Sequence, residues 1–264
     1  MIDVSILIPV YNREKLLSRA IRSCLNQDIE KEKIEIIVIN DCSKEQEYYN
    51  YDWNHHDIRI IHLEQNTSEI FGFPNVAHVR NTGIENAKGK YVAFCDDDDI
   101  WLPNKIELQL KAMKTSGCKM SSTDGLIGYG VYNESSHYKK YNAEYYYSTL
   151  FTIYENHSLS KFKRFIKKFP GIGKLIPANA NNKLKNGFPE IWNLAFIKIH
   201  NCIITSSVLI EKSVLDKINN FRNVRMREAE DYDCWLRALE HTDCVYVKDL
   251  CFYYDMGHGS GQNY

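Results

Sequence analysis

Residues 91–103 have the sequence YVAFCDDDDIWLP, in which an apolar run leads directly into four consecutive aspartates. The apolar part, Tyr91–Cys95, predicts a buried β-strand. The aspartates could form a solvated acidic loop, but apolar residues follow them at once, and adjacent carboxylates repel one another. Carboxylates held at a rigid strand end are instead what Mg²⁺ or Mn²⁺ binds together with substrate phosphates and water. The stretch therefore predicts a site for a divalent metal and a diphosphate.

The chain before this stretch alternates between strand and helix patterns. Short apolar runs that predict buried strands lie at Val4–Val10, Ile34–Ile39 and Ile58–Leu63. Helical patterns run from Leu16 to Leu25, over Val76–Ala87 with Gly89 as its stop signal, and after Pro103. This alternation predicts an α/β fold with a mostly parallel sheet and helices on both faces. Ligands bind at the carboxyl ends of the strands in such sheets.

The chain after residue 115 has a less regular pattern. Strands are predicted at Cys118–Thr123, at Ile203–Ile210 and at Cys244–Val247, where the last strand would close the sheet. Glu228–Glu240 has apolar residues at helical spacing and predicts a helix. No internal repeat interrupts the chain, so we expect one domain over residues 1–264.

Composition and charge limit which classes of protein and of binding partner are expected. The chain has 264 residues, 44% of them hydrophobic, and a formal net charge of -1, which offers no overall electrostatic basis for binding nucleic acid. Its eight cysteines show no C-x-x-C spacing, which favours buried free thiols in a reducing compartment. No apolar run reaches the ~20 residues of a membrane span, and no signal peptide pattern is present. We therefore expect a cytoplasmic protein.

Residues 156–189 differ in composition from the rest of the chain, because they contain eight lysines and arginines and no acidic residue. Within them, residues 159–169 place apolar side chains at helical spacing among the bases. Such a segment could lie on an anionic membrane surface as a peripheral contact. The alternative is a lid or acceptor-site loop whose lysines are solvated. The segment is interpreted as an insertion, and both alternatives stay open.

Several other residues are candidates for chemistry, each with a structural alternative. Asp41 follows the second strand and could bind a base or a ribose, or merely form a turn. Arg80 could bind phosphate through its planar guanidinium, or be a surface arginine. Glu230 and Asp231 could supply a general base, or simply suit a helix N-terminus. His258 could bind the metal, or be solvated in a glycine-rich tail.

Five segments together resemble the family 2 glycosyltransferases, which have the GT-A fold with a Rossmann-like central sheet. The segments are Pro9-Val10-Tyr11-Asn12, Asn40-Asp41-Cys42-Ser43, Arg80-Asn81-Thr82-Gly83-Ile84, Asp96-Asp97-Asp98-Asp99-Ile100-Trp101-Leu102-Pro103 and Glu230-Asp231-Tyr232-Asp233-Cys234-Trp235-Leu236-Arg237. The match is close over residues 1–115 and moderate over 200–240. Asn40 departs from the family, since many members have an aspartate there.

The resemblance implies inverting transfer of a sugar from a nucleotide-sugar, usually a UDP-sugar, with Mn²⁺ or Mg²⁺ as cofactor. It implies roles for particular residues: Pro9, Tyr11, Asn12 and Asp41 at the nucleotide; Arg80, Asp96 and Asp97 at the ribose and diphosphate; Asp98, with His258, at the metal; and Asp231, with Glu230 as the alternative, as general base. Residues 1–115 would be the nucleotide-sugar-binding half and 116–264 the acceptor-binding half.

The acceptor would be a saccharide or a lipid-linked saccharide, in the assembly of bacterial surface polysaccharide or glycolipid. One rival function is a nucleotidyltransferase, which needs a glycine-rich phosphate loop after the first strand. Here Tyr11-Asn12-Arg13-Glu14 follows that strand instead. The other rival is a module that binds sugar nucleotides without turnover, and the intact acidic run argues against it.

Overall fold

The computed structural model describes residues 2–30, 33–50, 58–158, 182–224 and 229–257. The strands are β1 (Val4–Val10), β2 (Ile34–Asn40), β3 (Ile58–His62), β4 (Tyr91–Phe94), β5 (Ile100–Trp101), β6 (Met120–Gly128), β7 (Lys139–Lys140), β8 (Ile191–Trp192), β9 (Leu209–Glu211) and β10 (Cys244–Asp255). The helices are α1 (Glu14–Leu25), α2 (Glu47–Asn50), α3 (Thr67–Phe71), α4 (Val76–Asn86), α5 (Lys105–Ser116), α6 (Tyr147–Ser158), α8 (Leu194–Ile197), α9 (Lys212–Lys217) and α10 (Glu230–Ala238). A π-helical turn spans Tyr141–Tyr145 and a 3₁₀ turn spans Thr205–Ser207.

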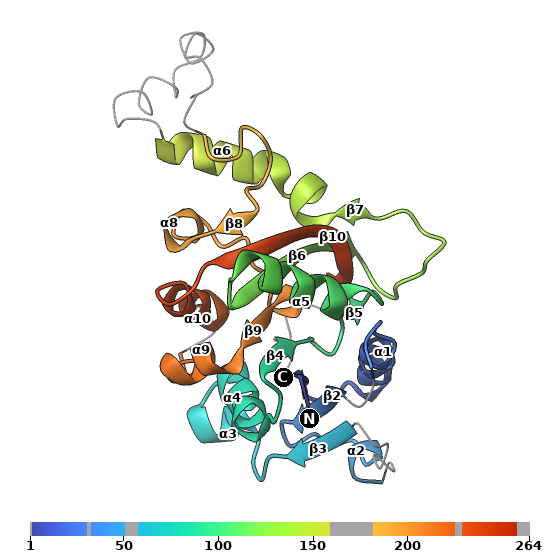
Figure 1. Cartoon of the computed structure of the whole chain (residues 1–264). Coiled ribbons are helices and arrows are strands. Elements are labelled where there is room, and N and C mark those ends of the chain that lie inside the picture. The colour runs from blue at the N-terminus through green and yellow to red at the C-terminus, as the bar shows by residue number, and fades with distance from the viewer. Residues whose placement is uncertain (1, 31–32, 51–57, 159–181, 225–228, 258–264) are drawn as a thin grey trace.

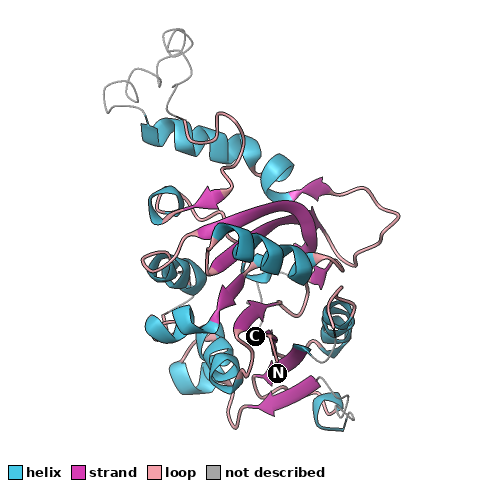
Figure 2. Cartoon of the chain, viewed as in Figure 1, coloured by secondary structure: helices cyan, strands magenta, loops and turns pink. Residues whose placement is uncertain are grey.

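The described strands form one sheet in the order β3-β2-β1-β4-β9-β6-β10-β5 (Figures 1 and 2). β1 is parallel to β2 and β4, β2 is parallel to β3, and β6 is parallel to β10. The short β9 runs antiparallel to both β4 and β6 and joins the two parallel parts. The predicted mostly parallel sheet is therefore confirmed.

Both faces of this sheet are covered around β1, which explains why that strand is almost entirely apolar. Along β1, Ile6 and Ile8 belong to one buried cluster, which also contains Leu17 and other residues of α1. Leu7 points to the opposite face and belongs to a second cluster, which contains Ile84 of α4. Successive side chains of a strand alternate between faces, so a strand buried on both sides has no polar face.

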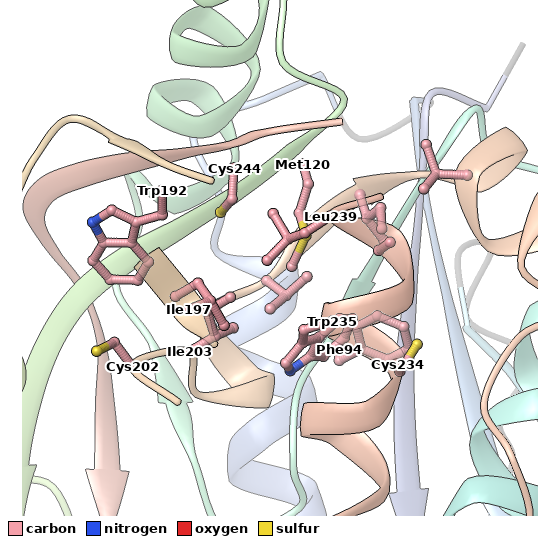
Figure 3. Close-up of a cluster of buried hydrophobic side chains, with 14 of the residues drawn as sticks. Phe94, Met120, Trp192, Ile197, Cys202, Ile203, Cys234, Trp235, Leu239 and Cys244 are labelled. Carbon is pink, nitrogen blue, oxygen red and sulfur yellow. The ribbon is translucent and has the colours of Figure 1, made fainter. Parts of the chain in front are cut away.

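The second cluster also positions the helix that carries the Glu-Asp pair. Trp235 of α10 packs on Phe94 of β4 with ring centroids 5.8 Å apart, and both are buried (Figure 3). Phe221 contacts both rings, at 5.5 Å in each case. Because Phe94 is the last residue of β4, this packing holds the N-terminus of α10 near the acidic run.

Gly89 does not have the role that the sequence predicted, because α4 ends at Asn86 with Ala87 as its C-cap residue. Gly89 instead lies against β1, where its backbone N–H donates to Ser5 Oγ at 2.8 Å. A Cβ at this position would lie 2.6 Å from the backbone nitrogen of Ser5. The close approach of two backbone segments is therefore what requires glycine.

We expect Gly89→Ala to lower the free energy of unfolding by about 1–3 kcal/mol, because the added methyl group must displace β1 backbone. Urea denaturation would measure this change. Gly83→Ala is the matched control, since its Cβ would meet only the side chains of Ile39 and Leu7, at 2.8 and 3.1 Å. Equal effects of the two substitutions would show that the contact with β1 backbone is not what makes Gly89→Ala destabilising.

Two other predictions in the second half are corrected by the structure. Ile203–Ile210 is not a strand: a 3₁₀ turn at Thr205–Ser207 interrupts it, and only Leu209–Glu211 is extended as β9. Ser206 Oγ in this turn accepts a hydrogen bond from the backbone N–H of Asp96 at 3.0 Å, so the turn helps to position the acidic run. The strand predicted at Cys244–Val247 continues to Asp255 and lies between β6 and β5, not at the end of the sheet.

Some predictions fall on residues outside the described ranges. They include the basic segment 159–169 and His258. All eight cysteines lie in the described ranges and all are free, as predicted, although Cys42 and Cys118 are only half-buried. Among the described helices, none combines the length and the apolar character needed to pass through a bilayer.

Candidate active site

The acidic run forms a tight turn between β4 and β5, closed by a hydrogen bond from the backbone N–H of Asp99 to the carbonyl of Asp96 at 3.1 Å. Asp96 is half-buried, whereas Asp97, Asp98 and Asp99 are buried. A solvated acidic loop is therefore wrong as an interpretation of this stretch. Four carboxyl groups are held together at the carboxyl end of a central strand.

Arg13, which was not among the predicted site residues, forms ion pairs with the acidic run. Its Nη1 lies 3.2 Å from Asp97 Oδ1 and 3.1 Å from Asp98 Oδ2. It directly precedes α1, in the turn that follows Tyr11-Asn12. Its position beside that motif could have identified it as a site residue, because a basic residue at the end of β1 faces the ends of neighbouring parallel strands.

The run brings together more carboxyl groups than its arginine partners can neutralise. Burial, followed by repulsion from Asp98, raises the pKa of Asp97 to about 8, although Arg13 acts in the opposite direction. Burial and repulsion from Asp96 raise the pKa of Asp98 to about 6. A site where carboxyl groups are this reluctant to ionise has a strong preference for an additional cation.

Arg80 connects the run to α10. Its Nη2 lies 2.9 Å from Asp96 Oδ1 and its Nη1 lies 3.0 Å from Glu230 Oε1. Only 4% of Arg80 is exposed, so the alternative of a surface arginine is wrong. Burial alone would lower the pKa of Arg80, but Asp96 and Glu230 outweigh it, so the pKa is raised and the guanidinium stays charged.

Asp231 lies in the first turn of α10, next to this ion-pair network. Its Oδ1 accepts a hydrogen bond from the backbone N–H of Tyr232 at 2.6 Å, and its Oδ2 accepts one from Thr205 Oγ1 at 3.3 Å. Burial, followed by repulsion from Glu230, raises the pKa of Asp231. The two candidate bases thus differ in environment: Glu230 is committed to an ion pair, whereas Asp231, within the described residues, accepts hydrogen bonds and forms no ion pair.

Asp41 is buried and already has partners within the protein. Its two carboxylate oxygens accept hydrogen bonds from the backbone N–H and the hydroxyl of Thr67, at 2.8 and 2.6 Å. The carboxylate therefore fixes the start of α3 beside the end of β2. Its predicted contact with a base stays a prediction, since a carboxylate oxygen can accept more than one hydrogen bond.

The residues after β1 form the neighbouring wall. Pro9 is a buried residue of β1 itself, and Tyr11 is half-buried just beyond the strand. Asn12 has a φ of 51°, an uncommon conformation for a residue other than glycine. Its backbone N–H donates to Ser43 Oγ at 2.9 Å, and its side-chain oxygen accepts from the backbone of Lys44 at 2.8 Å. These bonds join the turns that follow β1 and β2.

Asp99 joins the acidic run to the other half of the chain. Its Oδ1 accepts a hydrogen bond from the backbone N–H of Asp255, at the end of β10, at 3.1 Å. Asp255 Oδ1 in turn accepts from the backbone of Gly130 and Gly257, at 2.7 Å each. Nothing local in the sequence indicated that β10 would end beside Asp99.

The donor set fits a hard divalent cation that is completed by substrate. In the described residues, no three His, Cys, Asp or Glu side chains are already arranged as a metal site. Mg²⁺ and Mn²⁺ commonly use one or two carboxylates and take their remaining ligands from phosphates and water. The crowded carboxyl groups of Asp97 and Asp98 suit such a cation, because a cation would favour their ionised form. His258, a second predicted ligand, lies outside the described residues.

The chain is similar to a protein family and to individual relatives. The family model described as glycosyl transferase family 2 matches residues 5–182. An uncharacterized glycosyltransferase of Rickettsia felis is 37% identical over 240 residues, which cover 89% of this chain and 31% of the relative. The putative teichuronic acid biosynthesis glycosyltransferase TuaG of Bacillus subtilis is 33% identical over 126 residues, covering 46% of this chain and 45% of TuaG. Both alignments span less than half of the relative's length.

Solved structures share the fold. TarS 1–349 of S. aureus, in complex with UDP, has a TM-score of 0.62 at 16% identity, covering 97% of this chain and 61% of TarS 1–349. The mannosyltransferase PcManGT of Pyrobaculum calidifontis, in complex with GDP-Man and Mn²⁺, has a TM-score of 0.58 at 13% identity, covering 98% and 58%. The predicted GT-A type fold is confirmed by these neighbours.

Proposed function

Because this chain belongs to glycosyl transferase family 2, we propose that it transfers a sugar from a nucleotide-sugar to an acceptor hydroxyl, with inversion at the anomeric carbon. A UDP-sugar is the proposed donor, and surface polysaccharide or glycolipid is the proposed product. The Arg80 bridge is the observation that supports this most. It links Asp96 to Glu230 and so brings Asp231 to the acidic run.

In the proposed reaction, the acceptor oxygen attacks the anomeric carbon from the face opposite the diphosphate. The carbon–oxygen bond to the diphosphate breaks, and the proton of the acceptor hydroxyl passes to Asp231. We assign the base to Asp231 because Glu230 already pairs with Arg80 at 3.0 Å. A raised pKa also makes Asp231 a stronger base near neutral pH than an ordinary aspartate. A single displacement needs no covalent sugar–enzyme intermediate.

The acidic run would hold the diphosphate end of the donor. Asp98 is the proposed metal ligand, and Asp96 and Asp97 face the ribose and diphosphate. When bound, the cation would supply charge neutralisation for the departing diphosphate. Pro9, Tyr11, Asn12 and Asp41 are proposed to surround the nucleotide. Contact with an anionic membrane through residues 159–169 stays a prediction.

The test is turnover of a donor panel that contains UDP-glucose, UDP-N-acetylglucosamine and GDP-mannose, with Mn²⁺ or Mg²⁺, followed by release of the nucleoside diphosphate. We expect turnover of at least one UDP-sugar. Removal of the metal with EDTA, or Asp98→Asn, should lower the rate by roughly two to three orders of magnitude, because a catalytic metal contributes several kcal/mol. Full activity of Asp98→Asn with Mn²⁺ would refute the metal assignment.

The same assay separates the rival functions. A module that only binds sugar nucleotides would show donor-dependent thermal stabilisation without release of nucleoside diphosphate. A nucleotidyltransferase would form or cleave the bond between two phosphates and leave the sugar–phosphate bond intact. NMR of the product would show the anomeric configuration, and retention would refute the single displacement.

A further inference from the structure

The surface next to the acidic run is unusually rich in tyrosine. Seven of the 18 tyrosines in the chain lie within residues 129–147, between the end of β6 and the start of α6. Two more, Tyr253 and Tyr254, lie at the end of β10. Figure 1 shows these elements together, since β7 and the turn before α6 lie beside the ends of β6 and β10.

Five of these side chains form a continuous series, which we call the tyrosine track: Tyr254, Tyr141, Tyr146, Tyr145 and Tyr129. The ring centroids of Tyr254 and Tyr141 are 5.7 Å apart. The ring of Tyr146 lies 4.9 Å from that of Tyr141 and 4.8 Å from that of Tyr145. The side chains of Tyr145 and Tyr129 are hydrogen-bonding neighbours. The track thus connects β10 to the first residue of the loop after β6.

The inner end of the track lies at the acidic run. Tyr254 directly precedes Asp255, whose backbone N–H donates to Asp99. Burial, followed by the negative charge of Asp99 and Asp96, raises the pKa of the Tyr254 hydroxyl. Exposure then increases along the track, from half-buried Tyr254 to 37% at Tyr145 and 71% at Tyr129.

The fold holds the track in place. The buried carboxylate of Asp124 accepts hydrogen bonds from the backbone N–H groups of Asn142 and Ala143, at 2.9 and 3.2 Å, and so fixes the π-helical turn that carries Tyr141 and Tyr145. Tyr253 donates its hydroxyl hydrogen to the carbonyl of Gly130 at 2.8 Å and fixes the neighbouring loop. Exposed rings on a rigid frame lose little conformational entropy when they bind a ligand.

Tyrosine rings suit a saccharide in both chemistry and position. Each ring has an apolar face and a hydroxyl at its edge, and a pyranose likewise has an apolar C–H face and a rim of hydroxyls. The ring-to-ring steps from Tyr254 to Tyr145, which measure 4.8 to 5.7 Å, are each about the length of one sugar residue. A protein partner would need a wider apolar patch, whereas the exposed large apolar residues of this region, within the described part of the chain, are Tyr129, Val131 and Tyr145.

We propose that the tyrosine track binds an extended saccharide acceptor of two or more sugar residues, with its reactive end at the acidic run and its remaining residues stacked on Tyr145 and Tyr129. This inference rests on the proposed transferase function and makes it specific. The acceptor is then a growing chain, and affinity for it increases with its length until the track is filled.

The test uses full-length protein and an array of bacterial polysaccharides with their one- to six-residue oligosaccharides, supplemented by the cello- and chito-oligosaccharide series. We expect the wild type to bind at least one series about tenfold more tightly as a tetrasaccharide than as a monosaccharide, given the strength of aromatic contacts. Tyr129→Ala and Tyr145→Ala should remove most of this gain. Tyr129→Phe, which keeps the ring, and Ile191→Ala, another exposed apolar residue, should retain it.

Absence of any length-dependent saccharide binding by the wild type would overturn the proposal, as would an unchanged length dependence in both alanine variants. Wild-type turnover of UDP-sugars is measured in parallel. If turnover is present and the length dependence is not, the transferase function stands and the tyrosine track fails. If saccharide binding depends on length but no donor turns over, the track stands as a saccharide site and the proposed reaction fails.

Discussion

Asp231→Asn is expected to lower kcat by about 10²–10⁴-fold, the usual contribution of a general base, while donor binding changes little. The amide is nearly the same size as the carboxylate and can keep the hydrogen bond from Thr205, but it cannot accept the proton of the acceptor hydroxyl. Steady-state kinetics with a saturating donor would measure kcat, and thermal shift with UDP would measure donor binding. Asp233→Asn is the matched control, because Asp233 is on the same helix but pairs with Arg237 and Arg222.

The pH dependence provides a second readout for the same residue. A base must be deprotonated to act, so kcat should rise with pH through the pKa of Asp231. Burial and Glu230 raise that pKa, and the acidic limb should therefore lie above the range of an ordinary aspartate. Glu230→Gln removes the like charge and should move the limb to lower pH. If Asp231→Asn retains wild-type kcat, or if Glu230→Gln alone abolishes turnover, the base is not Asp231.

Arg80→Met is expected to lower the free energy of unfolding by about 3 kcal/mol, at the lower end of the range for breaking a buried ion pair. The substitution leaves Asp96 and Glu230 facing each other without their shared cation. The lower end applies because the side chain of Asp96 is 31% exposed and can be partly rehydrated. A loss of this size is a large share of the stability of a typical domain. Urea denaturation followed by circular dichroism would measure it.

Two further variants test whether the loss of stability in Arg80→Met comes from the broken ion pairs. Arg59→Met is the matched control, because Arg59 is 40% exposed and lies 3.7 Å from Glu35, so its loss should change stability by less than about 1 kcal/mol. Adding Glu230→Gln to Arg80→Met should recover part of the lost stability, since it removes one unpaired carboxylate. If Arg80→Met and Arg59→Met have the same effect, the bridge between α4, the acidic run and α10 is not structural.

Local sequence was sufficient for the parallel half of the sheet. Val4–Val10 was predicted with the same bounds as β1, because a strand buried on both faces is a near-continuous apolar run. The same reasoning failed at Ile203–Ile210, where Thr205-Ser206-Ser207 lies between an apolar pair and an apolar triplet of residues. There Ser206 and Ser207 turn the backbone so that their carbonyls accept hydrogen bonds from Trp101 and Gln109, at 3.1 and 2.8 Å. Those donors are about a hundred residues away, so no local pattern could indicate the turn.

The sequence by itself determined the family, the α/β fold and the identity of the acidic run, because each depends on neighbouring residues or on short ordered motifs. Only the tertiary structure decided which cations meet that run. Arg13 is 84 residues from Asp97, and Arg80 is 150 residues from Glu230. It also decided that Glu230 is committed to an ion pair, whereas within the described residues Asp231 is not, and that the tyrosine track begins beside Asp99. Charge pairing and ring packing act through space, and spacing along the chain does not specify them.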